Sequence, residues 1–133
     1  MRFLIVLFAS LAMTVAAGSA YSAGDAKRGA KQFSRCKSCH AVEAGKNKIG
    51  PSLHAVVGRK AATEAKYKYS KSLKAAGEKG LVWTEANLME YLAGPTKFLK
   101  KYLEAKKVSN KMKNKFKKKS LRENIIAYLA TVK

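Results

Sequence analysis

The sequence predicts a small all-α domain with a helix near each end, and three observations support that prediction. No alternating strand pattern of any length occurs in the chain. Residues 26–38 are rich in Ala, Lys, Arg and Gln, which favour helix, and they follow Asp25, a good N-cap. Near the C-terminus an apolar stripe recurs at helical spacing: Leu121, Ile125, Tyr128, Leu129 and Val132. We expect this stripe to pack on the face that Gly29 and Phe33 share, four residues apart.

The first 23 residues have the pattern of a secretory signal peptide. Arg2 supplies a positive charge, and residues 3–17 form an uncharged apolar run that is shorter than the ~20 residues a spanning helix needs. Small residues follow, and cleavage fits after a residue between 20 and 23. We therefore expect a cleaved leader over residues 1–23 and one monomeric domain over residues 24–133. In a bacterium this domain would be exported to the periplasm without a membrane anchor.

The formal charge of +20 points to an anionic partner, which could be nucleic acid, a membrane surface or an acidic protein. Export argues against nucleic acid. The basic residues are 23 Lys and only 5 Arg, whereas nucleic-acid binding more often uses the planar fork of Arg. Diffuse lysine charge suits long-range attraction to an acidic protein, so we predict such a partner and no nucleic acid.

Cys36 and Cys39 are the only cysteines, and His40 follows them directly. Cys-x-x-Cys-His is the attachment signature of c-type haem. Each thiol adds to one vinyl group of the porphyrin, and a three-residue step along a helix places both sulfurs on one face. The adjacent imidazole can then bind the iron. The motif predicts one covalently attached haem c.

Other uses of a Cys-x-x-Cys pair fit this sequence less well. A thiol–disulfide exchange site usually lies at the end of a strand in a βαβ unit, and no such pattern occurs. A zinc site needs further ligands, but His54 is the only other histidine and there is no third cysteine. A structural disulfide across two residues is possible but rare.

The centre of the chain predicts a long loop followed by one helix. Glycines punctuate residues 41–79, where we expect loops. Thr84 is a plausible N-cap, and Gly94-Pro95 would end the helix that it begins. The apolar face of this helix would contain Leu88, Met89, Tyr91 and Leu92.

A dense basic run separates this helix from the last one. Residues 97–119 contain 11 lysines and a single acid, Glu104. Large apolar residues interrupt the run, so a fully disordered segment is not expected. Ser120 and Glu123 then have the spacing of a capping box at the start of the C-terminal helix.

A series of motifs covers nearly the whole chain after the leader. In order they are Gly29-x-x-x-Phe33, Cys36-Lys-Ser-Cys39-His40, Gly50-Pro51-Ser52-Leu53-His54, Gly58-Arg59, Tyr67-Lys-Tyr69-Ser70, Gly80-Leu-Val-Trp83-Thr, Glu90-Tyr91-Leu92, Pro95-Thr-Lys-Phe-Leu-Lys and Glu123-Asn-Ile-Ile-Ala-Tyr128-Leu129. Their content and order resemble class I cytochrome c, and within it the bacterial cytochrome c-two branch. The resemblance implies the small cytochrome c fold, in which the N- and C-terminal helices cross around one covalently bound haem c.

The resemblance also implies roles for individual residues. His40 would be the proximal iron ligand, and Pro51 would offer its carbonyl to the other imidazole nitrogen. Met112 would be the sixth ligand, because the family places a methionine on the loop before the last helix. The rival Met89 is better explained as core. The remaining implied positions are Arg59, Tyr69 and Trp83 near the inner haem propionates, His54 at the surface or on the propionate side, and Gly29, Phe33, Ile125 and Tyr128 at the helix crossing.

The loop around Met112 departs from the pattern of many relatives. Those relatives have Pro-Gly-Thr-Lys before the methionine, whereas this chain has Val108-Ser-Asn-Lys111. They place an aromatic residue two positions after it, whereas Asn114 holds that place here and Phe116 follows two residues later.

We expect the protein to be an electron carrier and not an enzyme, transferring one electron through an exposed haem edge. Six lysines would ring that edge and dock acidic redox proteins transiently: Lys97, Lys100, Lys101, Lys111, Lys113 and Lys115. The resemblance suggests a cytochrome bc complex, or a periplasmic dehydrogenase, as donor and a photosynthetic reaction centre or a terminal oxidase as acceptor. The alternative is a haem protein with a labile sixth ligand, acting as a gas binder or peroxidase-like enzyme. A basic lipid-binding protein would explain the charge but not Cys36, Cys39 and His40.

Overall fold

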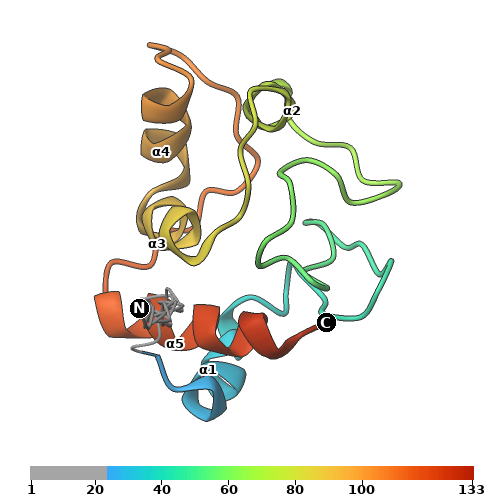
Figure 1. The fold of residues 1–133 in the computed structure, drawn as a ribbon, viewed down its shortest axis with the longest axis vertical. Helices are drawn as coiled ribbons and strands as arrows, with labels where there is room; N and C mark the ends of the chain where they lie inside the picture. The colour runs from blue at the N-terminus through green and yellow to red at the C-terminus, as the bar shows by residue number, and fades with distance from the viewer. Residues whose placement is uncertain (1–23) are drawn as a thin grey trace, which may run out of the picture.

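Five α-helices and one 3₁₀ helix make up the regular structure of residues 24–133, the part of the chain that the computed structural model describes (Figure 1). They are α1 (Ala26–Gln32), η1 (Phe33–Arg35), α2 (Lys71–Glu78), α3 (Glu85–Ala93), α4 (Pro95–Tyr102) and α5 (Lys119–Thr131). These residues contain no strand beyond one isolated antiparallel bridge between Lys60 and Val82. The all-α prediction is confirmed. The predicted leader lies outside the described residues, and no helix within 24–133 is long and apolar enough to cross a membrane.

The two ends of the described chain meet where α1 lies against α5 (Figure 1). Gly29 is buried, and a Cβ atom at this position would lie only 1.9 Å from the backbone oxygen of Asn124 and 2.9 Å from Cβ of Tyr128. The ring of Phe33, 1% exposed, packs with its centroid 5.4 Å from that of Tyr128. The predicted contact between the first and last helices is therefore confirmed, and glycine is required because α5 approaches the backbone of α1.

Helix α1 begins as predicted but ends earlier. Its N-cap is Asp25, whose carboxylate accepts a hydrogen bond of 2.9 Å from Arg28 N. The α-helix ends at Gln32 instead of continuing to Ser38, and η1 follows it directly. After η1, the N–H groups of Cys39 and His40 both donate to the carbonyl of Cys36, at 3.1 and 2.8 Å. The haem motif therefore lies in a hydrogen-bonded turn and not in a regular helix.

Two short helices lie where the sequence predicted none. Helix α2 interrupts the expected loop over 41–79, and Ser70 caps it by accepting a hydrogen bond of 3.2 Å from Leu73 N. Gly94-Pro95 ends α3 as predicted, but Pro95 is also the first residue of α4. Proline is favoured at this position because its fixed φ suits a helix and its missing N–H would have no helical partner. The predicted N-cap Thr84 is confirmed by a 3.1 Å bond from Asn87 N.

The predicted capping box at Ser120 is wrong. Helix α5 begins at Lys119, so Ser120 lies inside its first turn, and no side chain of residues 24–133 caps it. Glu123 instead pairs with Lys119 at 3.5 Å, one turn away on the helix surface. The guanidinium of Arg122 holds the chain entering α5 by donating to the carbonyls of Phe116 and Lys117, at 2.6 and 2.7 Å.

Helix α3 packs on both α4 and α5 and so connects these two helices within the core. Its predicted apolar face is buried: Leu88, Met89, Tyr91 and Leu92. Trp83, just before α3, lies with its ring centroid 4.8 Å from that of Tyr91, which is 5.7 Å from that of Phe98 on α4. This aromatic cluster fixes α3 and α4 beside the site described below.

The close approach of α1 and α5 predicts that Gly29→Ala destabilises the protein. Helix propensity alone would make this change stabilising by about 1 kcal/mol. The new methyl group would instead overlap backbone atoms of α5, so we expect the free energy of unfolding to fall by about 2–3 kcal/mol. Guanidinium denaturation measures it. Ala30→Ser, on the exposed side of α1, should change the value by less than about 0.5 kcal/mol, and a stabilised Gly29→Ala protein would contradict the packing argument.

Candidate functional site

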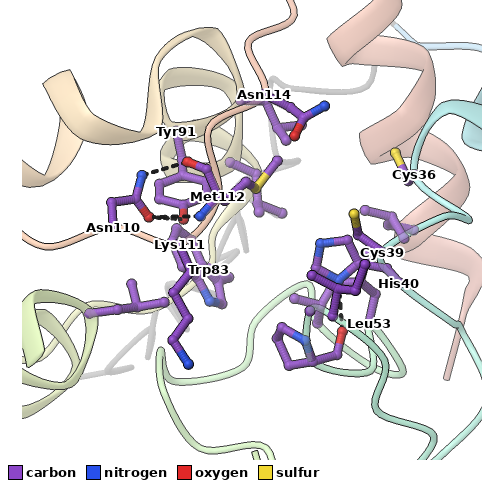
Figure 2. A pocket seen from close by; sticks show the side chains of 18 of the residues that line it. Cys36, Cys39, His40, Leu53, Trp83, Tyr91, Asn110, Lys111, Met112 and Asn114 are labelled. Carbon is purple, nitrogen blue, oxygen red and sulfur yellow. Dashed lines mark hydrogen bonds between the residues drawn. The ribbon is translucent and has the colours of Figure 1, made fainter. Parts of the chain in front are cut away.

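A cavity lies between α3, α5 and the loops that precede α2 and α5. Much of its wall is apolar: Leu53, Val56, Leu88, Leu92, Ile125 and Leu129. All the residues predicted to bind the cofactor line it: Cys36, Cys39, His40, Pro51, Arg59, Tyr69, Trp83 and Met112. Figure 2 shows Cys36, Cys39 and His40 on one side of the cavity and Met112 facing them from the other. The fold therefore brings together a set of residues that the sequence spreads over 77 positions, from 36 to 112.

His40 is held tightly by the loop at residues 50–51. Its Nδ1 lies 2.8 Å from the carbonyl oxygen of Pro51, so this nitrogen is the donor and Nε2 is left for a metal. A Cβ atom on Gly50 would lie 2.3 Å from Cε1 of the imidazole, so only glycine allows the loop to lie against the ring. Burial lowers the pKa of His40, the bond to Pro51 opposes this change, and Lys48 lowers the pKa further. The ring therefore stays neutral, which is the form that binds metals.

The two cysteines lie beside this histidine as free thiols. Burial raises the pKa of Cys36 to about 11, neighbouring Cys39 adds to the rise, and Arg35 opposes it. Cys36 is therefore a neutral thiol at neutral pH. Two unbridged thiols in one turn, both lining the cavity, provide the groups that attachment of a haem requires.

Met112 is held in place by the side chain of Asn110. Asn110 Nδ2 donates to the carbonyl of Met112 at 2.7 Å, and its Oδ1 accepts from Met112 N at 3.3 Å (Figure 2). The same amide accepts from the hydroxyl of Tyr91 on α3 at 3.5 Å and donates to Thr96 on α4 at 3.4 Å. Burial raises the pKa of Tyr91, with a smaller contribution from Tyr67, so the hydroxyl remains a donor. One buried amide thus fixes both peptide groups of Met112 to two helices.

Further contacts anchor the two ends of this loop. Ser109 N donates to Ser72 Oγ at 2.8 Å, and Ser72 N donates to Ser109 Oγ at 3.2 Å, which joins the loop to the first turn of α2. At the other end Phe116 N donates to the carbonyl of Leu92 on α3 at 2.9 Å. The departures from the family pattern in this loop are therefore accompanied by a full set of anchoring bonds.

The wall formed by Tyr69 and Trp83 offers hydrogen-bond donors. Both side chains are buried and line the cavity. The hydroxyl of Tyr69 accepts from Glu64 N at 3.1 Å, and within residues 24–133 neither this hydroxyl nor the indole N–H donates to a protein acceptor. Two donors that face an apolar cavity without a protein partner suit an acidic group on a bound ligand. Apolar walls, paired thiols, a neutral imidazole, a thioether and free donors together fit a haem.

Most of the other candidate residues do not line the cavity. His54 does not line the cavity, and its Nδ1 lies 3.2 Å from the carbonyl of Val42. Of the six predicted docking lysines, only Lys111 lines the cavity. Lys101 on α4 pairs with Glu90 at 3.1 Å.

Sequence reasoning gave no role to Asn110, Gly50 or Tyr67. The hydroxyl of Tyr67 donates to the carbonyl of Ile49 at 2.8 Å, and the ammonium group of Lys111 lies 5.3 Å from the centroid of its ring. Tyr67 therefore links the loop beside His40 to the loop that carries Met112. Gly50 and Tyr67 belong to the family motifs, but nothing in the motifs indicates the contacts that they make. Asn110 stood out only because it departs from the family pattern before Met112.

The comparisons with known proteins agree with this geometry. The cytochrome c family profile matches residues 26–133. Cytochrome c2 of Cereibacter sphaeroides is 41% identical over 99% of this chain and 97% of its own length. Cytochrome c2 of Rhodopseudomonas palustris is 47% identical over 82% of this chain and 99% of its own. The structure of cytochrome c2 from Rhodospirillum centenum is similar with a TM-score of 0.78 at 37% identity, covering 82% of this chain and 98% of that chain.

The contacts of Asn110 predict that Asn110→Ala loosens the loop of residues 108–116. The change leaves the peptide groups of Met112 without their partner, at a cost of about 1–3 kcal/mol. Hydrogen–deuterium exchange in this segment should become about 10-fold faster or more, since 1.4 kcal/mol corresponds to a factor of ten. Asn114→Ala, in the same loop but exposed, is the matched control and should leave exchange nearly unchanged. Equal effects of the two variants would contradict the role of Asn110.

Proposed function

Because the chain belongs to the cytochrome c family and to its cytochrome c2 branch, and is therefore a haem electron carrier and not an enzyme, we propose that Cys36, Cys39, His40 and Met112 hold its single haem c. The observation that carries this proposal is the position of His40 and Met112 on opposite sides of one cavity that both thiols also line (Figure 2). Two side chains placed in this way could bind one iron between them.

Each residue contributes in a distinct way. When bound, the haem supplies an iron that gains and loses one electron. Cys36 and Cys39 would each form a thioether bond with a vinyl group of the porphyrin. His40 would bind through Nε2, oriented by the carbonyl of Pro51, which also makes the imidazole more basic. The thioether of Met112 favours a higher reduction potential than a second histidine would.

The anchoring of the Met112 loop supports electron transfer over ligand binding at the iron. A gas binder or peroxidase-like enzyme needs an open sixth position. Here Asn110, Ser109 and Phe116 each tie the loop to a helix through hydrogen bonds. With a protein ligand on each side, the iron would gain or lose an electron without a change of ligands.

We further propose that the lysines on the Met112 loop attract acidic redox proteins. Lys111, Lys113 and Lys115 are exposed and alternate with Met112 and Asn114 along the chain. Their charge is part of a formal net charge of +20. A positive field around the haem edge would raise the rate of encounter with an acidic surface without requiring tight binding.

We propose that residues 1–23 direct export to the periplasm and are then removed. The electron donor would be a cytochrome bc complex or a periplasmic dehydrogenase. The acceptor would be a photosynthetic reaction centre or a terminal oxidase.

The proposed ligand set predicts the spectrum of Met112→Ala. The oxidised wild-type protein should show a far-red absorption band from the sulfur–iron bond. In Met112→Ala this band should disappear while the haem stays covalently attached, and the reduced variant should bind carbon monoxide. Met89→Leu, a change in the buried face of α3, should keep the band. A wild-type protein that lacks the band and binds carbon monoxide would instead favour the labile-ligand alternative.

The proposed docking charge predicts opposite effects on oxidants of opposite charge. Replacing Lys113 and Lys115 together by Gln should slow oxidation by the anion hexacyanoferrate(III) and speed it by the cation tris(phenanthroline)cobalt(III). Stopped-flow kinetics at low ionic strength would show roughly a several-fold change, which disappears as the Debye length falls from ~30 Å to ~8 Å. The control removes the equally exposed charges of Lys27 and Lys60. If this control changes both rates as much, net charge and not the loop determines the encounter.

A further inference from the structure

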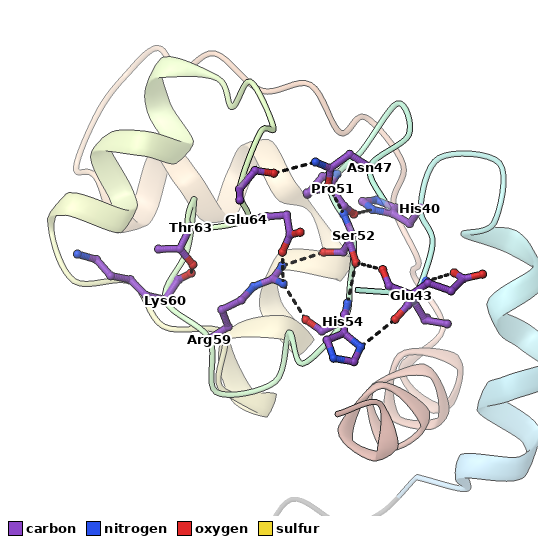
Figure 3. A network of polar contacts seen from close by, with 12 residues as sticks. His40, Glu43, Asn47, Pro51, Ser52, His54, Arg59, Lys60, Thr63 and Glu64 are labelled. Carbon is purple, nitrogen blue, oxygen red and sulfur yellow. Dashed lines mark hydrogen bonds and ion pairs between the residues drawn. The ribbon is translucent and has the colours of Figure 1, made fainter. Parts of the chain in front are cut away.

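One ion pair near the cavity is unlike the others in the described part of the chain. Arg59 Nη1 lies 2.9 Å from Oε2 of Glu64, and the two side chains are only 18% and 12% exposed (Figure 3). In each of the other four pairs within residues 24–133, the basic partner is at least 61% exposed. Exposed pairs are screened by water and salt, whereas a shielded pair acts on its surroundings through a lower effective dielectric.

The guanidinium of Arg59 donates its hydrogen bonds to acceptors of the protein itself. Besides Glu64, Nη1 donates to the carbonyl of His54 at 2.7 Å, and Nη2 donates to the carbonyl of Ser52 at 2.9 Å. Arg59 lines the cavity, so its charge lies close to the space that a haem would fill. The carboxylate of Glu64 neutralises that charge where it would otherwise act on the cofactor.

The position of Glu64 is fixed from two sides. Its side chain is held by Arg59, and its backbone N–H donates to the hydroxyl of Tyr69 at 3.1 Å. Both partners line the cavity. Glu64 therefore belongs structurally to the wall that carries the free donors of Tyr69 and Trp83, although it does not itself line the cavity.

We propose that Glu64 is a positioning and tuning residue that lowers the reduction potential of the haem by neutralising Arg59. This inference rests on the proposed function, because it requires the haem to lie in this cavity. A fixed negative charge disfavours the reduced state, which carries one electron more than the oxidised state. Neutralising Arg59 acts in the same direction, because a free positive charge beside the cofactor would favour reduction. The shielded charge of Glu64 thus opposes the effect of the chain's net positive charge on the reduction potential.

The test compares the reduction potentials of two haem-loaded variants by protein-film or solution voltammetry. Glu64→Gln removes the charge and keeps a hydrogen-bond acceptor for Arg59. At a fixed applied potential, we expect it to raise the ratio of reduced to oxidised protein about threefold, which is about 28 mV at 59 mV per tenfold for one electron. The matched control is Glu90→Gln, which removes the same charge from the exposed pair with Lys101. It should change the ratio by less than about 1.3-fold, and raised salt should not abolish the shift in Glu64→Gln.

Two further variants distinguish charge from geometry. Glu64→Asp keeps the charge and should stay within about 1.5-fold of the wild-type ratio. Glu64→Ala removes the charge without an amide and should shift the ratio in the same direction as Glu64→Gln, which provides the measurement if the glutamine variant does not retain its haem. The proposal is overturned if Glu64→Asp shifts the ratio as much as the neutral variants, or if the neutral variants resemble Glu90→Gln.

The far-red band of the same samples separates this proposal from the ligand assignment. A wild-type protein without the band contradicts Met112 as ligand. A wild-type protein with the band, together with an unchanged potential in both neutral variants, contradicts only the role of Glu64.

Discussion

The contact between Gly29 and Asn124 fixes the turn that bears the cysteines relative to the part of the cavity wall that α5 forms. Helix α1 has only seven residues, too few to be stable in isolation, so it depends on α5. Besides the packing at Gly29, Asn124 accepts from Asp25 N at 2.9 Å and donates to Gln32 at 3.2 Å. The chain passes from α1 through η1 into the turn that bears the cysteines, while α5 supplies Ile125 to the cavity wall. A displaced crossing would therefore move the attachment turn relative to the wall behind it.

The two candidate ligands are positioned by different means. His40 is fixed by close packing, because Gly50 leaves no room for a side chain beside the ring and the carbonyl of Pro51 accepts a hydrogen bond from its Nδ1. Met112 is fixed by polar contacts, because the amide of Asn110 bonds to its backbone and to two helices. A glycine–proline pair suits the first task, since it combines close approach with a stiff loop. A buried amide suits the second, since a loop without regular structure must satisfy its own peptide groups.

The sequence predicted those parts of the fold that depend on interactions between residues close together in the chain. The caps at Asp25 and Thr84 and the stripe of α5 are each encoded within a few residues. Helices α2 and α4 escaped prediction because both are short and rich in lysine, and their stability comes from packing on the rest of the chain. The cavity residues were predicted through the family motifs. The role of Asn110 was not, because its partner Tyr91 lies 19 residues away and nothing in the local sequence shows that they meet.

This protein has both exposed and shielded charged groups, and the two kinds affect different properties. The lysines of the Met112 loop are exposed, so salt screens them. In the proposed function they would influence how often partners meet more than how readily the iron is reduced. The pair of Arg59 and Glu64 is shielded on both sides, so it acts on the equilibrium between the two oxidation states with little interference from salt. A chain with a formal charge of +20 would otherwise favour the reduced state through its whole field. One shielded carboxylate beside the cavity offsets part of that field without weakening the surface attraction, and so allows the potential and the encounter rate to be adjusted independently.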